Sequence, residues 1–174
     1  MGKVYHNRVS SCQTQALWII VRTERKMTDY SQINAMLEGL VSGVGYTMAN
    51  LANASALLNE QLDGLNWVGF YTIKDNQLVL GPFQGKVACT IIQIGKGVCG
   101  TAVAEDRTQL VPDVHKFPGH IACDSASNSE IVIPMHRKGE IFGVLDIDSP
   151  LFNRFDENDR EGLEEFVRIL ERYV

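Results

Sequence analysis

Residues 66–80, NWVGFYTIKDNQLVL, decide the fold class of this chain. Apolar and aromatic residues fill two runs, 66–73 and 77–80, and the polar triplet 74–76 separates them. Two such runs joined by a short polar turn are typical of a β-hairpin. The pattern therefore predicts an antiparallel pair of strands, and the rest of the domain is built outward from it.

The segment before this hairpin, 30–62, has a helical pattern. Apolar residues recur there at intervals of three and four, at Ile33, Met36, Leu37 and Leu40 and again at Met48, Leu51 and Leu58. The glycines of 43–45 interrupt the pattern. We therefore expect two helices that meet at a glycine break.

The segment after the hairpin returns to strands. Residues 87–94 predict a strand, 98–104 a short helix, and 130–148 a second hairpin with its turn at 137–140. Pro134 lacks an amide donor, so its strand should be bulged there or lie at an edge of the sheet. Residues 111–129 show no periodicity, which is typical of a functional loop.

The chain closes with an amphipathic helix that begins near the acidic residues after Asp156. Its apolar face carries Leu163, Phe166, Val167 and Leu170. Helices, then an antiparallel sheet, then a helix predict an α+β fold. We expect a single domain with N- and C-terminal helices packed on the sheet.

Length and charge limit the function classes. The 174 residues suit one domain, and the net charge of −5 without any basic run argues against a nucleic-acid partner. No apolar stretch reaches the roughly 20 residues that span a bilayer, so we expect no membrane insertion. Residues 1–26 carry a net charge of +4 and have no export signal. We expect either a weakly ordered basic extension or sequence upstream of a natural start at Met27. The expected location is therefore the reducing cytoplasm.

Three cysteines, Cys89, Cys99 and Cys123, lie in glycine-rich or turn-rich stretches. Their separations match neither a zinc knuckle nor a Cys-x-x-Cys motif, so any partnership must be made by the fold. Cys99 lies in the first turn of a predicted helix, and Cys123 lies near His120 in the irregular loop; both settings can stabilise a thiolate. Cys89 has neither feature and resembles a resolving thiol. The alternative is that all three are small core residues.

Acids and aromatics add to a candidate site. Asp146 and Asp148 are two apart in a strand, so their side chains share one face of the sheet, and Glu130 is a third acid. Trp67 and Tyr71 also share a face. These residues predict a small site for a cationic group with an apolar or sulfur-bearing tail.

We expect neither a metal nor a cofactor in this site. His115 and His120 are five residues apart across a proline, which is not the spacing of a helical ligand pair. The prediction is that both are solvated loop histidines.

Six blocks of the chain closely resemble one enzyme family, the free methionine-(R)-sulfoxide reductases, which have a GAF fold. The blocks are 66–71, 80–89, 95–102, 113–124, 129–132 and 143–148. The resemblance extends from about Tyr30 to the C-terminus, and we expect a GAF-like catalytic domain over 27–174. It implies an L-methionine (R)-S-oxide reductase that acts on the free amino acid, is recycled by thioredoxin and forms a homodimer.

The resemblance also implies residue roles. Cys123 would attack the sulfoxide, with Cys99 as the other candidate, and Cys89 would then form a redox-active disulfide with Cys123. Trp67 and Tyr71 would bind the substrate side chain. Glu130, Asp146 and Asp148 would bind its polar groups, with one of them, Glu130 or Asp148 foremost, supplying a proton. The choice of the R epimer rests on the resemblance alone.

Two other functions compete with this hypothesis. A GAF module could bind a small molecule without turning it over, although such modules are usually tethered to another domain. A general peroxide or disulfide oxidoreductase could use the same thiols without needing the acids.

Overall fold

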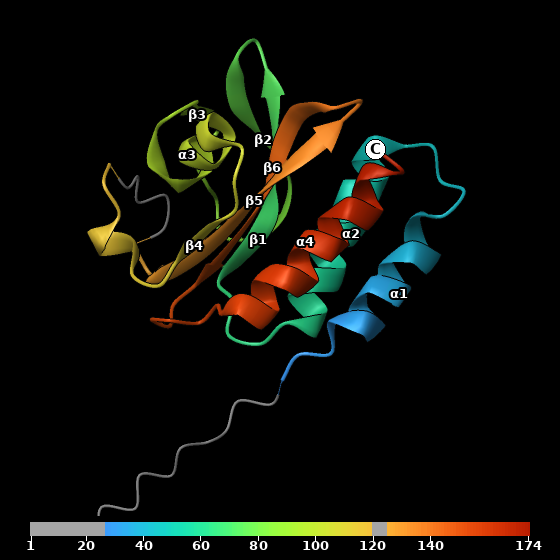
Figure 1. Cartoon of the computed structure of the whole chain (residues 1–174), viewed down its shortest axis with the longest axis horizontal. Coiled ribbons are helices and arrows are strands. Elements are labelled where there is room, and N and C mark those ends of the chain that lie inside the picture. Colours follow the sequence, from blue (N-terminus) through green and yellow to red (C-terminus); the bar gives the residue numbers. More distant parts are fainter. Residues whose placement is uncertain (1–26, 120–124) are drawn as a thin grey trace, which may run out of the picture.

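The computed structural model describes residues 27–119 and 125–174. The expected basic extension, 1–26, and the loop residues 120–124, with His120 and Cys123, lie outside the described residues. Figure 1 shows one antiparallel sheet with helices on both of its faces. The α+β prediction is confirmed.

Six strands form the sheet in the order β3-β2-β1-β6-β5-β4, and every neighbouring pair is antiparallel. Their bounds are β1 Trp67–Lys74, β2 Gln77–Gly85, β3 Ile91–Gln93, β4 Gln109–Val111, β5 Ser129–Arg137 and β6 Glu140–Ser149. Both predicted hairpins are present, as β1–β2 and β5–β6. The β1–β2 turn places Asp75 and Asn76 at φ 51° and 59°, a left-handed conformation that Asn and Asp tolerate better than most residues.

Two strand predictions need correction. The second strand of the first hairpin runs to Gly85 rather than Leu80, and the strand expected over 87–94 is only β3. Pro82 interrupts the periodicity of the sequence, which is why the pattern ended early. β2 nevertheless keeps its pairing with β1 at Phe83, past a register shift between Gly69 and Tyr71.

The segment 111–129 has more structure than its sequence indicated. It includes the end of β4, a 3₁₀ turn η1 (Val114–Lys116) and the start of β5. β4 pairs with β5 only as far as Val132, so Pro134 lies where β5 pairs with β6 alone. The missing amide donor is tolerated there because, within the described part of the chain, no second strand pairs with β5 at this position.

Three helices cover one face of the sheet: α1 Tyr30–Val41, α2 Thr47–Gln61 and α4 Glu157–Glu171. Asp29 caps α1 by accepting from the Gln32 amide at 3.1 Å, and Asp156 and Asp159 form a reciprocal capping box at the start of α4. The predicted break between α1 and α2 is present, with Gly43 at φ 78°. The fourth helix, α3 (Gly97–Glu105), lies on the opposite face (Figure 1).

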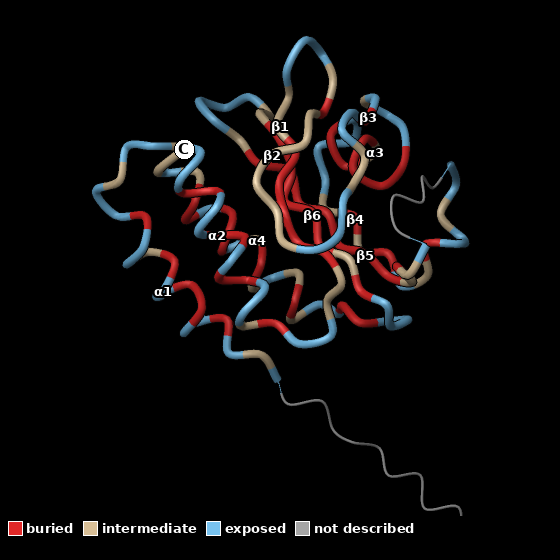
Figure 2. Tube along the Cα trace, turned by 180° about the vertical axis from the view of Figure 1, so that it is seen from behind, coloured by how far each residue is buried: buried red, intermediate tan, exposed pale blue. Residues whose placement is uncertain are grey.

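The sheet separates two apolar clusters. Figure 2 shows the buried positions following the central strands between these two sides. On the side of α1, α2 and α4, Leu145 and Ile147 of β6 are fully buried. Asp146 is also buried but faces the α3 side, in the company of Trp67, Tyr71 and Cys99. The candidate site residues therefore gather on one face.

None of the α-helices within 27–119 and 125–174 combines the length and apolarity needed to cross a bilayer.

Candidate active site

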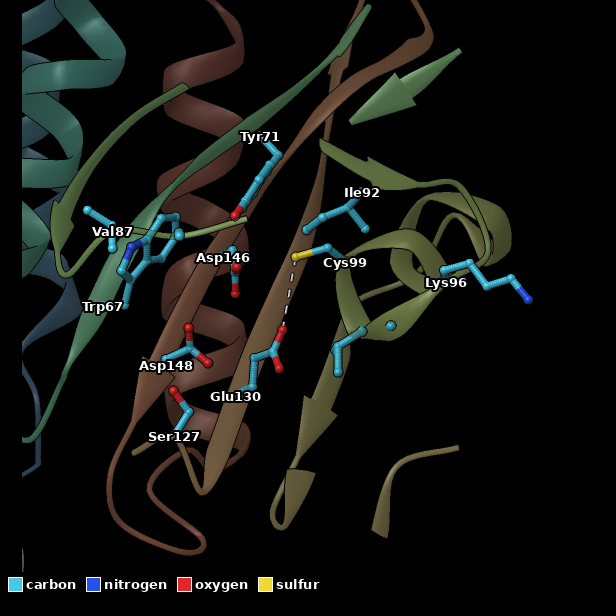
Figure 3. A pocket seen from close by; sticks show the side chains of 13 residues that line it. Trp67, Tyr71, Val87, Ile92, Lys96, Cys99, Ser127, Glu130, Asp146 and Asp148 are labelled. Atoms are coloured by element: carbon cyan, nitrogen blue, oxygen red, sulfur yellow. Dashed lines mark hydrogen bonds between the residues drawn. The ribbon is translucent and has the colours of Figure 1, made fainter. Parts of the chain in front are cut away.

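A pocket opens between the α3 face of the sheet, the start of α3 and the segment that joins β2 to β3 (Figure 3). It encloses about 540 Å³, counting the space that opens to solvent. Its lining consists of Trp67, Tyr71, Val87, Ala88, Ile92, Lys96, Gly97, Val98, Cys99, Ser127, Glu130, Asp146 and Asp148. The structure thus brings together both predicted aromatics, all three predicted acids and Cys99.

The two aromatics form one wall of the pocket. Trp67 and Tyr71 stack with ring centroids 5.8 Å apart, and the Trp67 ring also stacks on Phe83 at 5.3 Å. A Cβ on Gly69 would come within 2.7 Å of the Trp67 ring and 2.3 Å of Phe83 Cβ, so only glycine allows this packing. The result is a flat apolar surface suited to a methyl or thioether group.

The same aromatics hold the segment that carries Cys89. Trp67 Nε1 donates to the carbonyl of Lys86 at 3.1 Å, and the Tyr71 hydroxyl donates to the carbonyl of Cys89 at 3.0 Å. Each aromatic ring therefore lines the pocket and also holds the backbone of the segment at the pocket rim by a hydrogen bond.

The acids come from two neighbouring strands. Glu130 in β5 lies opposite Asp148 in β6, and Asp146 is two residues further along β6 on the same face. Glu130 and Asp146 are each only 6% exposed. No described arginine or lysine forms an ion pair with either of them, so both acids are buried without a compensating cation.

Burial and mutual repulsion shift the protonation of these acids. The pKa of Glu130 is raised well above its usual value, first by burial and then by the charges of Asp146 and Asp148. Burial raises the pKa of Asp146 to about 6, and the Cys99 and Glu130 groups beside it partly oppose this rise. Glu130 is therefore the acid of the two in which the neutral form is more strongly favoured, while Asp146 is mostly ionised at neutral pH.

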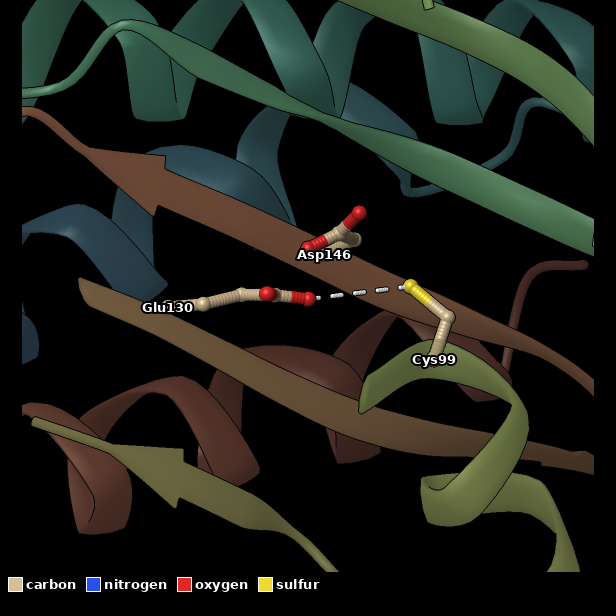
Figure 4. Close-up of side chains that lie close together, drawn as sticks. All are labelled: Cys99, Glu130 and Asp146. Carbon is tan, nitrogen blue, oxygen red and sulfur yellow. Dashed lines mark hydrogen bonds between the residues drawn. The ribbon is translucent and has the colours of Figure 1, made fainter. Parts of the chain in front are cut away.

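Cys99 lies in the first turn of α3, as predicted, but its surroundings disfavour the thiolate form that a reactive cysteine needs. Its Sγ is 4.0 Å from Glu130 Oε1, and the side chain is 4% exposed (Figure 4). Burial, followed by the charges of Asp146 and Glu130, raises the pKa of Cys99 well above its usual value. These effects outweigh the helix N-terminus, so the expectation of a stabilised thiolate at Cys99 is wrong.

Close backbone packing fixes the position of Cys99. A Cβ on the next residue, Gly100, would lie 2.3 Å from the carbonyl oxygen of Gln93. Glycine is required at that contact because any side chain would push α3 away from the end of β3. The thiol is thereby held against the acids of β5 and β6.

Of the three predicted thiols, the structure describes Cys89 and Cys99. Cys89 is disulfide-bonded, whereas Cys99 is a free thiol. Cys123 lies outside the described residues, so its pairing with Cys89 stays a prediction. Of the two loop histidines, His115 contacts Asn128 Oδ1 at 2.9 Å on the surface, and His120 also lies outside the described residues.

Sequence reasoning missed several pocket residues. Ser127 is buried and its hydroxyl accepts from Asn66 Nδ2 at 2.9 Å, while Lys96 occupies the N-cap position of α3 at the pocket wall. Ile92 and Val98 complete the apolar lining. None of these residues has a local pattern that separates it from an ordinary strand, loop or helix-cap residue, so only the fold could find them.

Comparison with known proteins places this chain in a family. The model of the GAF domain family matches residues 32–174. The free methionine-R-sulfoxide reductase of Escherichia coli (strain K12) is 54% identical over 145 residues, which are 83% of this chain and 88% of that protein. The free methionine-R-sulfoxide reductase of Saccharomyces cerevisiae (strain S288c) is 47% identical over 149 residues, which are 81% of this chain and 83% of that protein.

A solved structure gives the same answer. The free methionine-R-sulfoxide reductase of Neisseria meningitidis, in complex with its substrate, superposes with a TM-score of 0.80 at 46% identity. The match covers 83% of this chain and 87% of that one. A relative this similar over most of both chains, together with the matched domain model, confirms the GAF fold and the resemblance drawn from the sequence. The chain belongs to the free methionine-R-sulfoxide reductases of the GAF domain family.

Proposed function

We propose that the protein reduces free L-methionine-(R)-sulfoxide to L-methionine. The observation that carries the proposal is Glu130, a carboxyl group buried in the pocket beside an aromatic wall, where burial and the charges of Asp146 and Asp148 raise its pKa and favour the neutral acid. A sulfoxide oxygen is a poor leaving group until it receives a proton, so a neutral acid is what the reaction requires. Simple ligand binding gives no reason to bury an acid in this form.

The first step is attack of the Cys123 thiolate on the sulfoxide sulfur. Glu130 transfers its proton to the sulfoxide oxygen, methionine leaves, and the oxygen stays on the cysteine as a sulfenic acid. The sulfoxide gains two electrons and the cysteine loses them. Cys99 is not the attacking group in this scheme, because its buried thiol stays protonated.

Asp146 and Asp148 bind the substrate ammonium group. Asp146 is mostly ionised at neutral pH, since its pKa is about 6, and a buried carboxylate without a cation gains most from a cationic ligand. A methionine sulfoxide inside a peptide has no ammonium group at this place. The acids therefore explain a preference for the free amino acid.

The following steps regenerate the reduced enzyme. The Cys89 thiol attacks the sulfenic acid of Cys123, water leaves, and a disulfide forms. Thioredoxin then reduces this disulfide by thiol exchange, as the family resemblance implies. By the same resemblance the protein is a homodimer in the cytoplasm, and sedimentation of the full chain would measure the assembly.

The test is a steady-state assay coupled to thioredoxin reductase and NADPH. We expect turnover of free methionine-(R)-sulfoxide and at least 100-fold lower kcat/KM for the free S epimer and for a peptide sulfoxide. Cys123→Ser should abolish turnover. Cys12→Ser is the matched control and should leave the rate unchanged, because Cys12 belongs to none of the motifs.

Single-turnover measurements separate this mechanism from its rivals. Cys89→Ser should release one methionine per chain and then stop with a sulfenic acid that a cyclic diketone can trap. A Cys123→Ser variant that keeps full turnover would refute the mechanism. Equal rates with hydrogen peroxide and with the free sulfoxide would instead favour a general thiol oxidoreductase.

A further inference from the structure

Three buried side chains in the pocket form a cluster whose arrangement goes beyond sulfoxide reduction. One ligand-type atom from each of Cys99, Glu130 and Asp146 lies within 4.8 Å of the other two. Figure 4 shows the three side chains converging from α3, β5 and β6. Three different elements thus bring a sulfur and two carboxyl groups to one point.

A second observation shows that this cluster lacks a partner. The Asp146 side chain is only 6% exposed, and its Oδ1 accepts no hydrogen bond within the described structure. A buried carboxylate oxygen without a partner is costly, and native proteins rarely keep one without a reason. Since Asp146 also lines the pocket, a ligand that enters the pocket can reach this oxygen.

The donor set selects the type of ligand. A thiolate with two carboxylates suits a borderline-soft divalent cation such as Zn²⁺, whereas Mg²⁺ and Ca²⁺ prefer oxygen ligands only. Tetrahedral zinc, with bonds of about 2.3 Å to sulfur and about 2.0–2.2 Å to oxygen, keeps its ligand atoms roughly 3.5 Å apart. The triad needs to contract by about 1 Å to meet this geometry, which side-chain rotation can supply.

We infer that Cys99, Glu130 and Asp146 form a binding site for Zn²⁺ or a similar thiophilic divalent cation inside the substrate pocket. Three protein ligands leave the fourth coordination position open toward the pocket. The bound cation displaces the protons of the Cys99 thiol and the Glu130 carboxyl group to solvent and occupies the place of the substrate ammonium. The site therefore inhibits the reductase, and binding releases protons and strengthens as pH rises.

On the described surface, His136 also lies beside two acids. His136 places its two ring nitrogens 3.2 Å from Glu171 Oε1 and 2.9 Å from Asp106 Oδ1. Both nitrogens are thus engaged with carboxylates, and that group includes no thiol. The thiophilic site is specific to the pocket.

Co²⁺ serves as the probe, because its bond to a thiolate gives near-ultraviolet charge-transfer absorption that oxygen ligands do not give. The full chain carrying Cys12→Ser, Cys89→Ser and Cys123→Ser has Cys99 as its single thiol. We expect one Co²⁺ per chain with the thiolate band, and stoichiometric loss of that band when Zn²⁺ is added. Raising the pH from 6 to 8 should tighten binding at least 10-fold.

Matched variants in the same background test each ligand. Cys99→Ser should remove the thiolate band, and Asp146→Asn should weaken Co²⁺ binding at least 10-fold. Asp113→Asn, which changes the N-cap acid of η1 outside the pocket, should leave binding unchanged. Circular dichroism checks that each variant is folded.

Absence of the thiolate band in the folded parent, or its persistence at full affinity in Asp146→Asn, would overturn the site. Because the readout needs no turnover, these outcomes do not depend on the proposed reductase activity.

Discussion

The two faces of the sheet bury carboxyl groups in opposite ways. On the helix side, Asp159 is fully buried, pairs with Arg154 at 3.3 Å and accepts from the Tyr30 hydroxyl at 2.8 Å. On the pocket side, Glu130 and Asp146 are also buried, at 6% exposed each, but have no such cation among the described residues. One face neutralises its acid with a neighbouring charge, whereas the other raises the pKa of its acids and so favours their protonated forms.

This difference separates structural acids from chemical ones. The helix-side acid joins the start of α4 to α1 and to the loop after β6, so its charge contributes to stability. The pocket acids destabilise the fold, because each is more easily ionised in the unfolded chain. A fold keeps such groups when a ligand or a reaction uses them.

Glu130→Gln should give the largest effect on the pocket side. It removes the transferable proton but keeps the shape of the side chain, so we expect kcat to fall about 10²- to 10⁴-fold. The unfolding free energy should change little or rise, since a buried acid is removed. Steady-state assays and urea unfolding measure the two quantities. Glu140→Gln, the same change at an exposed position of β6, is the control; equal activity in both variants would mean that Glu130 donates no proton.

Asp159→Asn is the counterpart on the helix side. It leaves Arg154 buried without its charge partner, so the unfolding free energy should fall by about 3–5 kcal/mol. Activity per folded molecule should persist, because the pair lies across the sheet from the pocket. Glu157→Gln, which breaks only the exposed pair with Arg160, should cost less than about 1 kcal/mol. A similar loss in both variants would contradict the buried role of Asp159.

The pH dependence of stability gives a third contrast. The pKa of Asp146 is raised from 3.8 to about 6 on folding, so the folded chain keeps a proton that the unfolded chain releases between these values. Stability should therefore fall by roughly 3 kcal/mol as pH rises through this window. Asp146→Asn should remove this pH-dependent decline, even if the substitution also changes the unfolding free energy by an amount that is the same at every pH. Urea unfolding of both proteins at pH 4 and pH 7 measures it, and parallel pH profiles would refute the assignment.

Tyr71→Phe should have the smallest effect. It deletes the hydrogen bond to the Cys89 carbonyl and keeps the ring, so the unfolding free energy should drop by about 1 kcal/mol. Loosening the rim should also slow disulfide closure a few-fold, which stopped-flow fluorescence of Trp67 would follow. Unchanged closure would show that the rim is held by other contacts.

Local pattern explains which parts of the fold the sequence could predict. The hairpins follow from two-residue alternation and turn chemistry, and the face shared by Asp146 and Asp148 follows from the geometry of one strand. β4 was missed because three residues are too short for any periodicity. Its pairing with β5 is a long-range choice that the local sequence does not encode.

The site was predicted in membership but not in electrostatics. Motif blocks predicted Trp67, Tyr71 and Glu130 as members, and the pocket contains them. The sign of the Cys99 shift could not be predicted, because a local rule about helix starts competes with acids brought from 31 and more residues away. Burial and distant charge, which only the tertiary structure defines, decide that competition.

The hydrogen bonds of Trp67 and Tyr71 to the carbonyls of Lys86 and Cys89 have a consequence for engineering. The side chains that would recognise the substrate methyl group also anchor the segment that carries Cys89, one thiol of the proposed redox pair. A change made to admit a larger sulfoxide would therefore alter the closure rate and reduction potential of the disulfide at the same time. Substrate range and disulfide chemistry are therefore coupled in this structure. A successful redesign would need compensating changes in 86–90.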